Sequence, residues 1–178
     1  MLAGLASAIA SPALAQGQAC RVDVELGGIR ECAIAVNPLD PQNIAVTSWS
    51  SGLRVSTDGG LTWSDPPTEA PVPDGWLQNY AGDPSLAFDS QGRLFWCYLG
   101  QGGPAPGVRI LILQVNPTTG APVAGPFEVP ALGTSHDDKP WLAADAFSGS
   151  PFSDRLYVVW FVSEPSARVK LHSRAVLG

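Results

Sequence analysis

Charged side chains, and basic ones above all, are scarce in this sequence. Asp, Glu, Lys and Arg together make up 15% of the 178 residues, and the formal net charge at pH 7 is −6. No basic patch is present that could neutralise the phosphates of a nucleic acid. No apolar run reaches the roughly 18 residues that a membrane-spanning helix needs. The composition therefore argues against nucleic acid as a partner and predicts no membrane span.

Several motifs that mark common chemistries are also missing. The sequence has no nucleophile elbow, no P-loop, no dinucleotide fingerprint and no HExxH pattern. Its three cysteines lack the spacing of a zinc site. Cys20 and Cys32 are close enough in sequence to pair, whereas Cys97 lies in an apolar run and is predicted to be a buried free thiol. We expect no metal and no cofactor.

The first fifteen residues are apolar and rich in alanine. They end in Ala13-Leu14-Ala15, which resembles the cleavage site of a secretory signal peptide, so the mature chain is predicted to start near Gln16. No basic residue precedes the apolar stretch, which leaves a loose alanine-rich tail as the alternative. A signal peptide over residues 1–15 predicts that the protein is secreted or periplasmic.

Glycine and proline are abundant, and they interrupt short runs rich in β-branched and aromatic residues, as in an all-β protein. Three such segments, which start at Glu31, Asp83 and Lys139, resemble one another. Each has an apolar residue followed by alanine and, two positions later, by Asn or Asp, whose side chain is expected to bond the backbone of a turn. The three sets are Ile34, Ala35 and Asn37; Leu86, Ala87 and Asp89; and Leu142, Ala143 and Asp145.

A repeat of about 50 residues built from short strands is typical of the blades of a β-propeller. We predict about three four-stranded antiparallel blades within residues 16–178, with fourth strands around Trp63 and residues 126–129. Because propellers close with roughly four to eight blades, three blades form an incomplete ring. The chain is then a fragment of a longer one or completes its ring with another chain, and its open blade edges are expected to self-associate.

The segment STDGGLTWS, residues 56–64, lies between the third and fourth predicted strands of the first unit. It matches the pattern S-x-D-x-G-x-T-W and so resembles the Asp box of sialidase-like, or BNR-repeat, propellers. Physically, Asp58 is suited to accept backbone hydrogen bonds across the turn, and Gly60 to a positive φ. The resemblance implies a structural motif away from any active site. The matching residues are Ser56, Asp58, Gly60, Thr62 and Trp63.

The resemblance extends over nearly all of the mature chain, because residues 32–46 and 138–145 resemble first strands of secreted bacterial sialidase-like proteins. It implies an exo-glycosidase of the sialidase type, acting on extracellular glycans, or a fragment of such an enzyme that is inactive in isolation. Such enzymes hold the substrate carboxylate with three arginines, and Arg30 stands where the first is expected. Glu31 and Cys32 replace the Ile-Pro that follows in the family. The other two arginines and the Tyr/Glu nucleophile pair belong to later blades, which this chain lacks.

The repeat itself points to a further set of residues. Glu31, Asp83 and Asp138 stand at the starts of the three predicted first strands. The innermost strands of a propeller begin on a common face of its channel, so these carboxylates are expected to converge. Converging carboxylates in different environments suit general acid/base hydrolysis of a glycoside. The alternative is that they cap the strand starts by bonding loop backbone.

Three aromatic side chains are candidates for contact with a sugar. Trp76 and Trp141 are placed to stack on a sugar face, and Tyr80 precedes a first strand and is expected to face the channel mouth. Trp141 alternates with Leu142, so a place in the core is its alternative. The run His136-Asp137-Asp138 offers too few ligands for a calcium site. For the chain as a whole, the alternative to an enzyme is a non-catalytic propeller that serves in glycan binding, adhesion or protein interaction.

Overall fold

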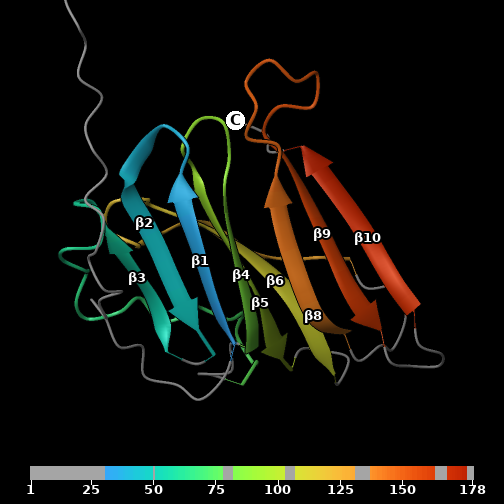
Figure 1. Ribbon diagram of the computed structural model, residues 1–178. Helices are drawn as coiled ribbons and strands as arrows, with labels where there is room; N and C mark the ends of the chain where they lie inside the picture. Colours follow the sequence, from blue (N-terminus) through green and yellow to red (C-terminus); the bar gives the residue numbers. More distant parts are fainter. Residues whose placement is uncertain are drawn as a thin grey trace, which may run out of the picture.

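The computed structural model describes residues 31–49, 51–77, 82–102, 107–130, 137–162 and 168–175. These residues form β-strands and no helix, and the strands make three antiparallel sheets (Figure 1). The prediction of an all-β protein is therefore confirmed. Nothing in the described part of the chain forms an apolar helix of the length that a bilayer requires.

The first sheet has three strands, in the order β1-β2-β3. They are β1 (Cys32–Asn37), β2 (Asp40–Ser48) and β3 (Gly52–Ser56). The fourth strand expected around Trp63 is not formed, and only an isolated bridge joins Leu53 to Thr68. The reason is local, since Pro66 and Pro67 have no N–H to donate to a ladder. The prediction of a strand around Trp63 was wrong.

The second and third sheets follow the expected strand pattern. The second sheet has the order β4-β5-β6-β7, with β4 (Gly82–Phe88), β5 (Leu94–Gln101), β6 (Val108–Val115) and β7 (Pro122–Glu128). The third has the order β10-β9-β8, with β8 (Asp137–Ala144), β9 (Arg155–Val162) and β10 (Arg168–Ala175). The expected fourth strand of the second unit is β7, which begins four residues earlier than predicted.

The second sheet lies between the other two (Figure 1), and each of its faces builds one apolar cluster. One cluster joins it to the first sheet through side chains such as Leu53, Leu86 and Trp96. The other joins it to the third sheet through Phe95, Cys97 and Val158. Cys97 is a fully buried free thiol, as predicted, and burial raises its pKa. Because both faces are covered, β5 is buried along nearly its whole length.

The first strands of the three sheets lie side by side, β4 between β1 and β8 (Figure 1). They run in the same direction, since Glu31, Asp83 and Lys139 meet at their starts and the turns after β4 and β8 meet at their ends. A hydrogen bond of 3.0 Å from the Leu142 N–H to the Ser85 hydroxyl also joins β8 to β4. The residues that begin these strands are thereby brought to one end of the molecule.

Candidate functional site

A non-glycine residue in the left-handed region lies at or near the start of each of the three first strands. The φ angles are 49° at Glu31, 45° at Asp83 and 48° at Lys139. The pairing registers of β4 and β8 shift at the same place, between Gly82 and Ser85 and between Asp138 and Trp141. A left-handed non-glycine residue costs about 1–2 kcal/mol. The same uncommon conformation therefore recurs at the same position of the repeat in all three units.

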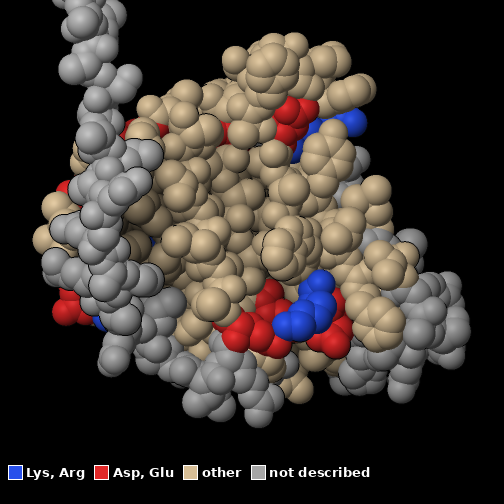
Figure 2. Space-filling view, in the orientation of Figure 1, with Lys and Arg blue, Asp and Glu red and all other residues tan. Residues whose placement is uncertain are grey.

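This geometry brings the side chains of these three residues together with that of Asp138, in what we call the strand-start cluster: Glu31, Asp83, Asp138 and Lys139. The Lys139 ammonium group pairs with Glu31 and lies 3.8 Å from Asp83 Oδ1. The backbone N–H of Lys139 donates to Asp83 Oδ2 at 3.0 Å. Figure 2 shows acidic side chains gathered around one basic side chain at the lower edge of this face, where the first strands begin. All three sheets contribute to the cluster.

Asp83 has the most perturbed environment in the cluster. Its side chain is almost wholly buried, beneath the exposed Lys139 and the partly exposed Glu31. Burial, reinforced by hydrogen bonds with Glu31 and Asp138, raises the pKa of Asp83 from 3.8 to about 7, and the hydrogen bond from the Lys139 backbone opposes this only in part. At neutral pH the Asp83 carboxyl group thus exists in both protonation states and is able to give or take a proton.

Lys139 supplies the positive charge of the cluster. Its pKa is raised, chiefly by the hydrogen bond to Glu31 and further by the charges of Asp83, Glu31 and Asp138. The ammonium group is therefore charged at neutral pH, and its side chain is 61% exposed. Sequence reasoning did not name Lys139 as a site residue. The signal was nevertheless present, because the repeat aligns Lys139, and not Asp138, with Glu31 and Asp83.

The other predicted site residues have different positions. Arg30 and Tyr80 lie outside the described residues. Trp76 is 8% exposed and packs in the cluster between the first and second sheets, so neither face of its ring is open to a sugar. Trp141 is 71% exposed on β8, on the side of the third sheet that faces away from the second. Among the described residues, neither tryptophan belongs to the strand-start cluster.

The Asp box forms a loop held by its own hydrogen bonds. Asp58 Oδ1 accepts from the Ser56 hydroxyl at 2.8 Å and from the Thr62 N–H at 2.9 Å, and Oδ2 accepts from the Thr62 hydroxyl at 2.6 Å. These bonds, those from Thr62 foremost, lower the pKa of Asp58 to about 2. Gly60 has a φ of 90°, and its carbonyl accepts from Trp63 Nε1 at 3.1 Å. The polar side-chain atoms of Ser56, Asp58, Thr62 and Trp63 thus form hydrogen bonds inside the turn.

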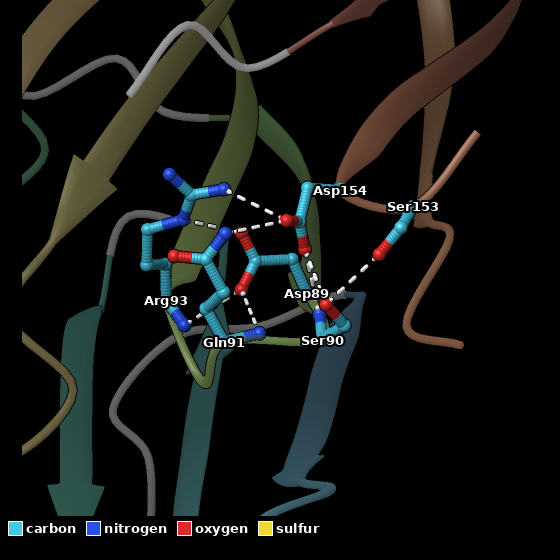
Figure 3. A network of polar contacts seen from close by, with 6 residues as sticks. All are labelled: Asp89, Ser90, Gln91, Arg93, Ser153 and Asp154. Atoms are coloured by element: carbon cyan, nitrogen blue, oxygen red, sulfur yellow. Dashed lines mark hydrogen bonds and ion pairs between the residues drawn. The ribbon is translucent and has the colours of Figure 1, made fainter. Parts of the chain in front are cut away.

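A second polar network lies at the opposite end of the first strands (Figure 3). Asp89 accepts from the N–H groups of Gln91 and Arg93 at 3.0 and 2.9 Å and pairs with the Arg93 guanidinium at 2.5 Å. Asp154, from the turn before β9, accepts from the Ser90 hydroxyl at 2.7 Å and so links the second and third sheets. We call this set the turn network: Asp89, Ser90, Gln91, Arg93, Ser153 and Asp154.

In all three units, the Asn or Asp that follows the apolar-alanine pair of the first strand accepts a hydrogen bond from the backbone of its turn, as predicted. Asn37 Oδ1 accepts from the Leu39 N–H at 3.0 Å, and Asp145 Oδ1 from the Phe147 N–H at 3.2 Å. Asp89 makes the equivalent bonds in the second unit. These residues are structural, because their oxygens are occupied by local donors.

No metal site is found among the described residues, where no group of three or more His, Cys, Asp or Glu side chains has a suitable arrangement. His136 of the run considered for calcium lies outside the described part. Asp137 is buried and accepts a hydrogen bond of 3.0 Å from Trp160 Nε1.

Comparison with protein-family models gives no match for this sequence, and comparison with curated proteins gives none.

Proposed function

We propose that the chain forms part of a sialidase-like β-propeller outside the cell or in the periplasm, and that its strand-start cluster acts on glycans as an exo-glycosidase site. Three features support the architecture: the recurring sheet unit, the parallel first strands that lie side by side, and the Asp box with its internal hydrogen bonds. The observation that carries the function is the buried Asp83 carboxyl group. It lies beside Glu31 and Asp138, and its pKa is about 7.

The proposed hydrolysis depends on the protonation states of the Asp83 and Glu31 carboxyl groups. Hydrolysis of a glycoside needs one carboxylic acid that protonates the leaving oxygen and one carboxylate that assists attack at the sugar carbon. Asp83 is the acid in this proposal, because burial keeps it protonated up to neutral pH. Glu31, held by Lys139, is the carboxylate. A carboxyl group whose surroundings raise its pKa, placed beside a second carboxylate, is the usual sign of such a division of roles.

The first test measures hydrolysis of fluorogenic methylumbelliferyl glycosides, a sialoside included, by the chain and by Asp83→Asn. Asparagine tolerates the left-handed backbone as aspartate does but cannot supply the proton. We expect kcat/KM to fall by about 100-fold or more. In the unsubstituted chain the rate should decline as the pH rises through about 7, where Asp83 loses its proton.

The matched control is Asp74→Asn, at an exposed carboxylate in the loop before Trp76, which should leave the rate unchanged. Arg30→Ala separates the sialidase type from other glycosidases, because losing a carboxylate-binding arginine should slow the sialoside and spare a neutral glycoside. A folded chain that neither hydrolyses nor binds any of these glycosides contradicts the proposal.

One observation favours a second, non-catalytic function. Lys139 bonds Glu31 through its ammonium group and Asp83 through its backbone, so that the cluster ties the three sheets together. A cluster whose groups are satisfied within the protein suits a rigid propeller that binds glycans or proteins. Glycan binding without turnover, with equal affinity in the chain and in Asp83→Asn, would support this function over the enzyme.

A further inference from the structure

Two Asp-Gly pairs occur in the sequence, Asp58-Gly59 and Asp74-Gly75, and no Asn-Gly pair occurs. An aspartate followed by glycine is prone to isomerisation of its main chain, because glycine has no side chain to hinder attack by its own backbone nitrogen. The attack needs a free backbone N–H at the glycine and a carboxyl group that is free to turn toward it. The two pairs differ in both respects.

The first pair lies in the Asp box and is held at both of its reacting groups. The Asp58 carboxylate accepts from the Ser56 hydroxyl at 2.8 Å and from the N–H and hydroxyl of Thr62 at 2.9 and 2.6 Å. The Gly59 N–H donates to the Gln42 carbonyl oxygen at 2.9 Å. These hydrogen bonds have to break before the nitrogen and the carboxyl group of this pair are able to meet.

The second pair lies in an exposed turn. The Trp76 N–H donates to the Pro73 carbonyl at 3.2 Å, and Gly75 has a φ of 81°, as at the third position of a type II β-turn. Among the described residues, neither the Asp74 carboxylate nor the Gly75 N–H has a hydrogen-bond partner. Space does not separate the two pairs, because a Cβ added to Gly59 or Gly75 would meet no heavy atom within 4 Å. Hydrogen bonding is the difference between them.

We propose that Asp74 is a site of spontaneous isoaspartate formation and that the Asp box protects Asp58 from the same reaction. The Gly75 nitrogen loses its proton and attacks Asp74 Cγ, so that an N–Cγ bond forms, a Cγ–O bond breaks and water leaves. The product is a cyclic imide, to which water then adds at either carbonyl carbon. Cleavage of the N–Cγ bond restores aspartate, whereas cleavage of the original peptide C–N bond leaves isoaspartate, whose main chain runs through the side-chain carbons.

The turn that would be modified connects two anchored points of the chain. Before it, the Pro71 carbonyl accepts from the Tyr98 hydroxyl, and after it the Leu77 N–H donates to the Gln101 carbonyl at 2.8 Å. Between these anchors Trp76 packs in the cluster between the first and second sheets. Isoaspartate lengthens the main chain between the anchors by a carbon atom. We therefore expect it to disturb the packing of Trp76 and to lower the melting temperature by about 2–4 °C.

The test incubates the purified chain at neutral pH and physiological temperature. Isoaspartate is followed by peptide mapping with electron-transfer dissociation, because aspartate and isoaspartate have the same mass but give different fragment ions. We expect isoaspartate to accumulate at Asp74 at least about tenfold faster than at Asp58, since a protected site reacts only from its locally opened state. In concentrated urea, where neither pair is held by the fold, the two rates should converge.

Asp74→Glu is the matched control, because it keeps the charge and would have to close a larger, slower ring. It should form no isoaspartate at this position and should keep its melting temperature during incubation. Asp74→Asn should react faster, because ammonia then leaves in place of water. Ser56→Ala combined with Thr62→Ala removes both hydroxyl donors to Asp58 and should raise the rate there while leaving the rate at Asp74 unchanged. Far-UV circular dichroism establishes that each variant is folded.

Equal rates at Asp58 and Asp74 in the folded chain overturn the inference, because the hydrogen bonds of the Asp box then give no protection. A folded chain that forms no isoaspartate at Asp74, although it does so in urea, overturns it as well, because the turn is then protected too. A modified chain with an unchanged melting temperature overturns the link to Trp76. The reaction needs no glycan, so a chain without glycan binding or turnover gives the same result.

Discussion

The two ends of the first strands both carry acidic side chains, and their environments differ. In the turn network, Asp154 accepts hydrogen bonds from Ser90 and Gln91 and lies 3.6 Å from the Arg93 guanidinium, and its pKa is lowered. In the strand-start cluster, Asp83 is buried beside other carboxyl groups, and its pKa is raised to about 7. Burial beside other carboxyl groups raises the pKa of Asp83, whereas hydrogen-bond donors, Ser90 foremost, lower the pKa of Asp154.

The largest effect is expected at Asp89, on the structural side of this comparison. Its side chain is wholly buried and receives two backbone N–H groups and the Arg93 guanidinium. Asp89→Ala leaves these donors without their acceptor, so we expect the free energy of unfolding to fall by about 3 kcal/mol. Urea denaturation measures this loss. Asp145→Ala, at the equivalent but less buried turn, should cost only about 1 kcal/mol. Equal losses would show that burial does not separate the two turns.

An intermediate effect is expected in the pH dependence of stability at Asp83. The pKa of Asp83 is about 7 in the folded chain against an ordinary 3.8, so the folded state retains a proton that the unfolded state has released. Its contribution is complete below about pH 4 and is lost as the pH rises to about 7. Thermal melting at constant ionic strength should show this decline in the chain and not in Asp83→Asn. Parallel curves would mean that burial and the neighbouring Glu31 and Asp138 do not raise the pKa of Asp83.

The smallest effect, and one of opposite sign, is expected at Asp154. Its folded pKa lies below the ordinary value, so its contribution to stability is present above about pH 4 and is lost as the pH falls through the folded pKa. Asp154→Asn keeps the left-handed backbone, which has a φ of 66°, and removes the charge. The stability difference between the chain and this variant should shrink below pH 4. A difference that grows on acidification would contradict the comparison.

Much of the fold was predictable because its signals are local. Asn37, Asp89 and Asp145 end their strands through hydrogen bonds to residues two to five positions away, and such bonds depend on sequence spacing alone. The convergence of Glu31, Asp83 and Asp138 was predicted from the repeat, since the starts of the first strands of stacked units fall at one end. The fourth strand predicted for the first unit is not formed, although Pro66 and Pro67, which cannot donate to a ladder, are visible in the sequence.

The sequence by itself determined the strands, their turns and the periodic placement of acids, because each follows from the pattern of neighbouring residues. Only the tertiary structure decided which of those acids holds a proton and which aromatics are open. Lys139 reaches Glu31 across more than one hundred residues, Trp76 is covered by packing between two sheets, and Asp83 is buried where three strands meet. Burial and long-range charge depend on distances that sequence spacing does not specify.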